Sequence, residues 1–264
     1  MKSNVSFDFK LFQPTGHLSA SVQAVWSASV ASHSENEVSR WLNSDGCSGI
    51  LLNLGESLSL GDIAFATGAV LLPVSKQTQR LILPPGAQVA GLRFHPAVGF
   101  GVLGKHCEAP TVLTMEDAPF DLMALYHQLR HTKGHHARVT ALYRWANRVI
   151  ATSHQVPPTL SQAIQSLNHL PFSTKLHRLS ENIPLSQRQL ERQFQKWLGM
   201  TAKQYQRILR VQKTLSGLKE NQDMALVSLA LSYGFTDQAH MTRELKKFAK
   251  ITPRQYREAV MNAH

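Results

Sequence analysis

Residues 229–248 read LALSYGFTDQAHMTRELKKF, and a segment that begins at Leu179 repeats their pattern earlier in the chain. Each copy has the pattern of a short helix, a tight turn and a second helix that carries arginines. When the alignment of the two copies is shifted by one residue, further positions match. The matching pairs are Arg192 and Arg243, Lys196 and Lys247, Trp197 and Phe248, Thr201 and Thr252, Gln204 and Gln255, and Tyr205 and Tyr256. A helix-turn-helix unit that occurs twice predicts two DNA-reading units, which we call the first and second heads.

The second helix of each head is expected to bury one face and expose the other. A capping box formed by Ser186 and Gln189 opens this helix in the first head. Apolar residues at helical spacing predict two buried faces, namely Leu190, Phe194, Trp197 and Leu198, and Met241, Leu245, Phe248 and Ala249. At about 100° per residue, the outer faces carry Arg188, Glu191, Arg192 and Gln195, and Ala239, Thr242, Arg243 and Lys246. Beside these faces lie Lys196 in the first head and Gln238, His240 and Lys247 in the second.

An outer face with arginines near its start suits the major groove of DNA, which admits one α-helix. Arginine can donate two hydrogen bonds to the O6 and N7 atoms of guanine, whereas the lysines beside the face suit phosphates. One such helix alone would be interpreted as an ordinary solvated amphipathic helix. Two copies with the same face in the same register favour contact with DNA.

Both copies continue into a T-x-x-Q capping box, at Thr201 and Thr252, that opens a further helix. The free backbone N–H groups at such helix starts suit a DNA phosphate. The helix from Ala202 to about Leu218 would join the two heads. It is expected to hold the reading helices roughly 34 Å apart, which is one turn of DNA.

The ordered pattern of residues 229–248, followed by ITPRQYR at residues 251–257, resembles the signature of the AraC/XylS family of transcription regulators. The resemblance covers about residues 160–260 and implies two helix-turn-helix subdomains in adjacent major grooves at promoters. It implies base-reading roles for Arg188, Glu191 and Arg192, and for Ala239 and Arg243 with Gln238 and His240 beside them. The partners expected are double-stranded promoter DNA, a small-molecule effector, a second copy of the chain and RNA polymerase.

The two heads differ at several positions. Pro184 stands in the first turn where the second copy has Gly234, and proline cannot adopt a positive φ. Glu191 would repel phosphate but can accept a hydrogen bond from cytosine N4, while Ala239 can make only apolar contact, for example with a thymine methyl. The two heads are therefore expected to read different half-sites.

Basic charge is concentrated in the part of the chain that carries the repeat. The net charge is +11, and residues 161–264 hold 16 Lys and Arg against 7 Asp and Glu, while residues 1–160 hold 12 against 10. This distribution is typical of a module that binds a polyanion. Binding to a membrane surface is less favoured, because the apolar residues of the C-terminal helices form core faces.

The chain before the repeat has two patterns. Short β-like segments are predicted at Leu18–Ser27, Ser48–Leu54, Val70–Val74, Gln79–Leu83 and Gln88–Phe94, which favours a barrel or sandwich. Residues 120–151 have helical periodicity and are predicted either to mediate dimerisation or only to cover the barrel. The expected fold is α+β, with a sensory and dimerisation domain at 1–151, a linker at 152–160 and an all-α DNA-binding domain at 161–264. Residues 91–104 also resemble the sensory region of some AraC-type regulators, which implies a cupin-like domain.

Other motifs in the N-terminal part are weaker. Gly99, Gly101 and Gly104 spell GxGxxG, but residues 105–110 do not open the helix that a dinucleotide site requires, so close packing explains the glycines better. His127 and His131 share a helix face near His135 and His136, yet a metal site would need further ligands. No cofactor, metal or catalytic residue is therefore expected.

The function expected is a non-enzymatic, sequence-specific transcription regulator. The two cysteines, Cys47 and Cys107, form no disulfide framework, and the first residues contain no signal-peptide stretch, so a cytoplasmic location is expected. A disulfide between them is the less favoured alternative. Two other functions remain open, namely a repair-type enzyme with an appended DNA-binding domain and a non-specific architectural protein.

Overall fold

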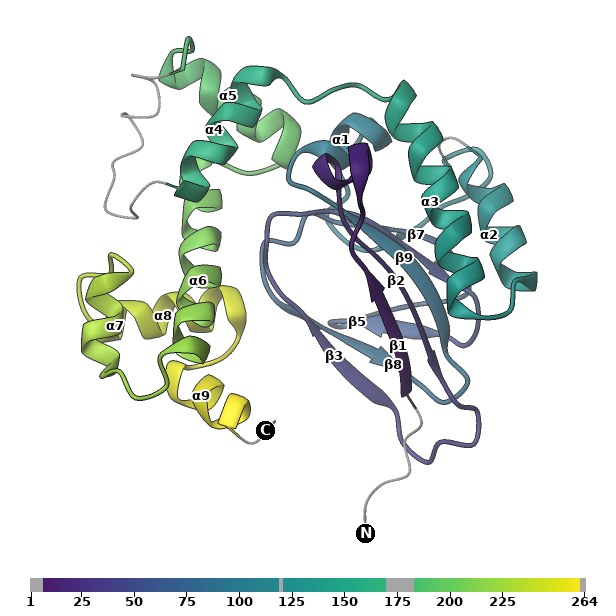
Figure 1. Ribbon diagram of the computed structural model, residues 1–264, viewed down its shortest axis with the longest axis horizontal. Helices are drawn as coiled ribbons and strands as arrows, with labels where there is room; N and C mark the ends of the chain where they lie inside the picture. Colours follow the sequence, from purple (N-terminus) through teal and green to yellow (C-terminus); the bar gives the residue numbers. More distant parts are fainter. Residues whose placement is uncertain (1–6, 119–120, 170–182, 262–264) are drawn as a thin grey trace. The chain divides into compact units, whose positions relative to one another are not determined.

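The computed structural model describes residues 7–118, 121–169 and 183–261 (Figure 1). Contacts divide the chain into two compact units. The first unit comprises Met1–Leu42, Cys47–Val74 and Gln79–Gln155. The second comprises Asn43–Gly46, Ser75–Thr78 and Val156–His264.

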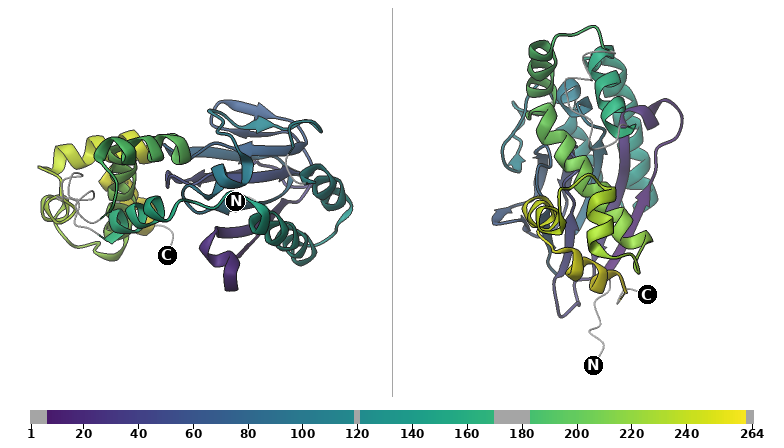
Figure 2. Two further views of the ribbon diagram at one scale, coloured as in Figure 1. Left: turned by 90° about the horizontal axis from the view of Figure 1, so that it is seen from above. Right: turned by 90° about the vertical axis from the view of Figure 1, so that its left-hand side faces the viewer.

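Two antiparallel sheets form the first unit (Figures 1 and 2). The larger sheet has the order β1 (Phe7–Phe12), β2 (Val22–Val30), β9 (Gln88–Phe94), β4 (Gly49–Asn53), β7 (Gly68–Leu72) and β10 (Thr111–Val112). The smaller sheet has the order β3 (Val38–Leu42), β8 (Gln79–Leu83), β5 (Leu58–Leu60) and β6 (Ile63–Phe65). Leu51 and Val70 of the larger sheet pack with Leu58 and Leu81 of the smaller sheet in one buried cluster.

Two helices cover the other face of the larger sheet, α2 (Leu122–His131) and α3 (His135–Thr152). Successive residues of a strand point to opposite faces, so Ile50 and Leu52 join a second cluster with Trp145. The helices therefore cover the sheet, while their role in dimerisation stays a prediction. A β-rich domain with flanking helices is confirmed.

The strand predictions were correct in the centre of the sheets and incomplete elsewhere. The predicted Gln79–Leu83 and Gln88–Phe94 coincide with β8 and β9. The predicted start of the first strand is wrong, because residues Gly16–Ala20 form a short 3-10 helix, η1, and β2 begins only at Val22. The pattern missed β1, β3, β5, β6 and β10, which are edge strands or have only two or three residues.

The GxGxxG motif lies in a short helix, α1 (Val98–Leu103), which ends at the third glycine instead of opening there. A Cβ atom added at Gly99 would collide with the hydroxyl of Ser48. Gly104 takes a φ of +69° and closes the helix. Close packing accounts for Gly99 and a tight helix end for Gly104, as predicted.

The second unit is helical throughout its regular structure. Its helices are α4 (Pro158–His169), α5 (Gln187–Leu198), α6 (Ala202–Glu220), α7 (Leu226–Ser232), α8 (Gln238–Ala249) and α9 (Pro253–Met261). Helix α6 joins the head that contains α5 to the head formed by α7 and α8, which confirms the predicted C-terminal architecture. The start of the first head, near Leu179, lies outside the described residues. Residues 153–157, between α3 and α4, form neither helix nor strand.

Candidate nucleic-acid interface

Helices α5 and α8 expose one face each and bury the other. All eight residues predicted for the buried faces are buried. Of the residues predicted for the outer faces, six are exposed, namely Arg188, Arg192, Gln195, Ala239, Arg243 and Lys246. The other two, Glu191 and Thr242, are half-buried. Lys196, Gln238 and Lys247 are exposed as well, and His240 is half-buried. Each helix thus presents a polar surface that a partner can reach.

Side chains fix the starts of both helices. Ser186 and Gln189 form the predicted reciprocal capping box on α5. Helix α8 is capped by Asp237, whose carboxylate accepts the backbone N–H of His240 at 2.6 Å. This hydrogen bond is the main cause of the lowered pKa of Asp237. This cap was not predicted from the sequence, although Asp is among the preferred residues at that position.

Glu191 differs from the other outer-face residues. Its Oε2 atom lies 3.3 Å from the backbone nitrogen of Ala202 and accepts its hydrogen bond. Ala202 is the first residue of α6, so this carboxylate holds the start of the joining helix. Glu191 was assigned to the outer face from residue spacing within α5 alone. That spacing does not reveal a hydrogen bond to Ala202, which lies 11 positions later and outside the helix.

His240 is fixed at the flank of α8. Its Nδ1 atom lies 3.1 Å from Oγ1 of Thr236, and its ring meets that of Phe235 edge-on at a centroid distance of 5.4 Å. Phe235 is buried. The imidazole therefore has one preferred orientation at the edge of the outer face.

An ion pair ties α8 to α6. The Arg207 guanidinium donates two hydrogen bonds to Glu244, at 2.8 and 2.6 Å, and stacks over the Phe248 ring at 5.0 Å. The Glu244 side chain is only 8% exposed. Hydrogen bonding to Arg207 lowers the pKa of Glu244 and raises that of Arg207, so both carry charge at neutral pH. This pair therefore holds α8 against α6.

Arg210, one turn further along α6, makes a second connection to the same head. Its guanidinium lies over the Phe235 ring at 5.3 Å and donates to the carbonyl of Gly234 at 3.3 Å. Gly234 has a φ of +71° and supplies the tight turn between α7 and α8. Arg207, Arg210 and Glu244 were not predicted from the sequence, because partners 24 and 37 residues apart leave no periodic signal.

Acid is expected to weaken the contact between α6 and α8. Because the folded pKa of Glu244 is lowered, its stabilising effect is fully present above the glutamate pKa of the unfolded chain. That effect is lost as the pH falls through the lower folded value. We expect thermal stability of the second unit to decrease as the pH falls from about 5 toward about 3. Glu244→Gln should show a smaller decrease by circular dichroism, and an equal decrease would contradict this assignment.

The first unit brings together Asp8, His135 and Ser27, which the sequence analysis did not connect. His135 Nε2 lies 3.2 Å from Oδ2 of Asp8, and its Nδ1 lies 2.8 Å from the hydroxyl of Ser27. The order resembles a catalytic triad, but Ser27 has no exposed surface and also contacts the carbonyl of Val89. The arrangement fastens β1 and α3 to β2 and offers no accessible nucleophile.

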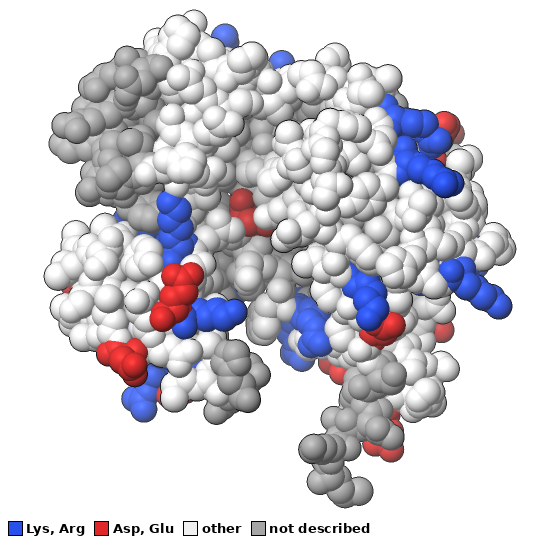
Figure 3. Space-filling view, viewed as in Figure 1, with Lys and Arg blue, Asp and Glu red and all other residues white. Residues whose placement is uncertain are grey.

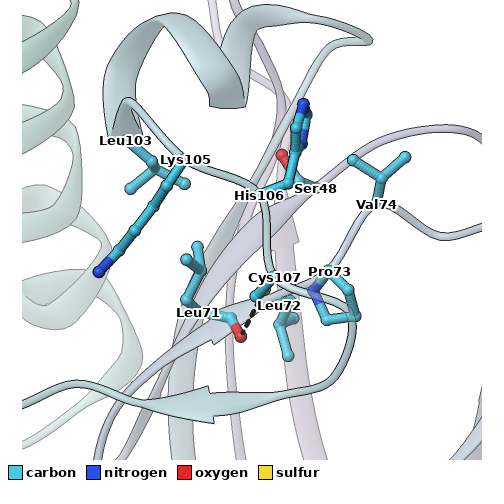
Figure 4. Close-up of a pocket in the computed structure, with 9 residues that line it drawn as sticks. All are labelled: Ser48, Leu71, Leu72, Pro73, Val74, Leu103, Lys105, His106 and Cys107. Atoms are coloured by element: carbon cyan, nitrogen blue, oxygen red, sulfur yellow. Dashed lines mark hydrogen bonds between the residues drawn. The ribbon is translucent and has the colours of Figure 1, made fainter. Parts of the chain in front are cut away.

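Among the described residues, the cysteines and histidines of the first unit form no catalytic or metal site. Cys107 lines a cavity of about 10 Å³, room for one water molecule, and its thiol points to the carbonyl of Leu71 (Figure 4). Burial raises the pKa of Cys107, which disfavours the reactive thiolate. Cys47 and Cys107 do not form a disulfide with each other. Across the described ranges there is no group of three or more His, Cys, Asp or Glu residues that could hold a metal.

The C-terminal part of the chain is similar in sequence to known proteins. A family model described as a helix-turn-helix domain matches residues 179–259. Probable transcription factor PqrA of Proteus vulgaris is 34% identical over 84 residues, which are 32% of this chain and 68% of PqrA. The multiple antibiotic resistance protein MarA of Escherichia coli K12 is 32% identical over 90 residues, which are 34% of this chain and 70% of MarA.

Two solved structures also resemble the chain. An AraC-type transcriptional regulator from Chromobacterium violaceum has a TM-score of 0.38 at 24% identity, covering 40% of this chain and 96% of that protein. ToxT from Vibrio cholerae has a TM-score of 0.46 at 8% identity, covering 84% of this chain and 97% of ToxT. Among the described helices, none combines the length and apolar character needed to cross a membrane.

Proposed function

Since this chain belongs to the AraC/XylS family of DNA-binding transcription regulators, we propose that α5 and α8 read two different half-sites in adjacent major grooves. The observation that carries this proposal is the pair of exposed outer faces, which differ in composition although their buried faces match. Helix α6 has 19 residues and is therefore about 28 Å long. That length is close to the roughly 34 Å between major grooves on one face of DNA.

In the first head we assign base reading to Arg188, Arg192 and Gln195. Arginine can bind guanine through two hydrogen bonds, and glutamine can do the same with adenine. Glu191 is engaged with the start of α6, so we assign it a positioning role in place of the cytosine contact. Lys196, beside the face, is assigned to a phosphate.

In the second head we assign base reading to Arg243, with an apolar contact from Ala239. Gln238 and His240 flank this pair at the start of α8, where a recognition helix meets base edges. Lys246 and Lys247, near the end of the helix, suit phosphates. The two heads thus differ in the bases they prefer.

We further propose that the first unit, expected at residues 1–151, modulates DNA binding through a small-molecule effector or self-association. The stretch at 152–160 serves as the linker, and residues 161–264 as the DNA-binding domain. We assign the chain no reaction and a cytoplasmic location. RNA polymerase is the proposed partner at the promoter.

The test is selection of bound sequences from a random DNA library with the full chain, followed by measurement of affinity at several salt concentrations. The expected result is a bipartite site whose two halves differ in sequence and lie about one DNA turn apart. Equal affinity for all sequences would contradict the proposal and indicate an architectural protein. Turnover of damaged DNA would indicate a repair-type enzyme.

Lys247→Ala is expected to weaken binding to all sequences alike. Lys247 is exposed, and its contact with Phe248 is a distant one, 5.9 Å from its ammonium group to the ring centroid, so alanine should remove the proposed phosphate contact and leave the fold intact. The slope of log affinity against log salt should decrease by about 1. Filter binding on the selected site and a scrambled site measures this slope. A loss confined to the selected site would place Lys247 among the base-reading residues.

A further inference from the structure

A cavity of about 280 Å³ opens between α2 and α3 of the first unit. Leu125 and Ala141 are buried and form its apolar floor. The residues that complete its lining are Asp121, Ala124, Gln128, Arg144 and Arg148, all of them exposed. The cavity has room for a compact molecule somewhat smaller than the usual ligands of protein pockets.

The hairpin around this cavity is strongly basic. Residues 122–152 contain five Lys and Arg, four His and no Asp or Glu. Over residues 1–160 the two signs are nearly balanced, at 12 against 10, so positive charge is concentrated on the hairpin. Lysine and arginine side chains lie over α2 and α3 at the right of Figure 3. The field at the cavity favours an anion.

Two guanidinium groups stand at the rim without a carboxylate partner. Arg144 and Arg148 are one turn apart on α3, and neither forms an ion pair with a described residue. Like charges at this spacing destabilise a helix slightly. A carboxylate between them would remove the repulsion and gain charge-assisted hydrogen bonds.

We propose that this cavity binds a small organic anion, a carboxylate held by Arg144 and Arg148 with a compact apolar body on Leu125 and Ala141. Gln128 at the rim is available to orient a polar substituent. Asp121, at the start of α2, is the one carboxylate of the lining and opposes anion binding. The further step, that this anion is the effector, rests on the proposed regulatory function, whereas the binding itself does not.

Other occupants fit these observations less well. A symmetric contact between two copies of the hairpin would place the same arginine-rich surface against itself. A DNA backbone would contact the charges but leave the apolar floor without a complement. The proposal therefore commits to an anion that has both a charged and an apolar part.

The experiment is isothermal titration calorimetry of the full chain with cyclohexanecarboxylate as the probe. Saturable binding is expected, and Arg144→Gln and Arg148→Gln should each weaken it roughly 10- to 100-fold, the loss of a charge-assisted hydrogen bond. Arg130→Gln is the matched control, an exposed arginine of the same hairpin outside the cavity, and should leave affinity unchanged. Asp121→Asn should tighten binding, and asparagine tolerates the positive φ of 54° found there.

Cyclohexanecarboxamide and acetate complete the test. The neutral amide and the anion without an apolar body should each bind at least about tenfold more weakly than the probe. No saturable binding, equal binding of all three compounds, or equal loss in Arg130→Gln would overturn the proposal. A change in dimerisation on Arg144→Gln without a change in probe affinity would also overturn it and indicate an interface. Because the titration contains no DNA, its result does not depend on whether the chain binds DNA sequence-specifically. Failure of one proposal can therefore be distinguished from failure of the other.

Discussion

Arg207→Ala is expected to lower the free energy of local unfolding of the second head by about 2–3 kcal/mol. Removing one partner leaves Glu244 as a buried, unpaired charge, which costs about 3–5 kcal/mol for a fully buried pair. Because the Arg207 side chain is 31% exposed, we expect a cost at or just below the lower end of this range, about 2–3 kcal/mol. The loss corresponds to roughly 30- to 150-fold faster exchange of the protected α8 amide hydrogens. Hydrogen exchange measured by mass spectrometry localises the effect to this helix.

An exposed ion pair of the same unit provides the control. Arg254 and Glu258 lie 3.0 Å apart on α9 and are 84% and 56% exposed. Arg254→Ala should therefore change stability by less than about 0.5 kcal/mol. The double variant Arg207→Met with Glu244→Leu should recover most of the lost protection, because it removes both charges together. If Arg207→Ala exchanges no faster than Arg254→Ala, the ion pair does not hold α8.

Arg243→Ala is expected to reduce affinity for the selected DNA site by about 1–3 kcal/mol, which is roughly 5- to 150-fold. The loss should fall on one base pair of the second half-site, so that the variant no longer distinguishes the four bases there. Arg192→Ala should have the same effect on one base pair of the first half-site. Fluorescence anisotropy with single-substituted sites at fixed salt measures both effects.

Two controls separate readout from general attraction to DNA. Lys247→Ala is expected to lower affinity at every sequence alike, whereas the arginine variants should lower it only at sites with the preferred base. Arg130→Ala, in the first unit, should leave DNA affinity unchanged. A uniform loss in Arg243→Ala would show that this side chain contacts phosphate instead of a base.

The heads were predictable because their signals are local. Helical spacing places Leu190, Phe194 and Trp197 on one face, and a capping box needs only Ser186 and Gln189. Both kinds of pattern lie within one or two helical turns. The duplication strengthened each of them, since a chance pattern is not expected twice in the same register.

The parts that were missed depend on residues far apart in the chain. The ion pair of Arg207 with Glu244 and the contact of His135 with Ser27 span 37 and 108 positions. Nothing in the local pattern selects these partners among the other charged and polar side chains. Strand β5 has only three residues, which is too short for alternation to be recognised. The cavity at α2 and α3 likewise required the packing of two helices.

The hydrogen bond between Glu191 and Ala202 restricts how the first head can evolve toward a new target sequence. Arg188, Arg192 and Gln195 are exposed, so substitution there should change the surface that we propose for DNA contact without disturbing the core. Substitution of Glu191 instead releases the start of the helix that carries the other head. Natural variation in target preference should therefore accumulate at the first three positions, while Glu191 is retained among relatives that recognise different promoters.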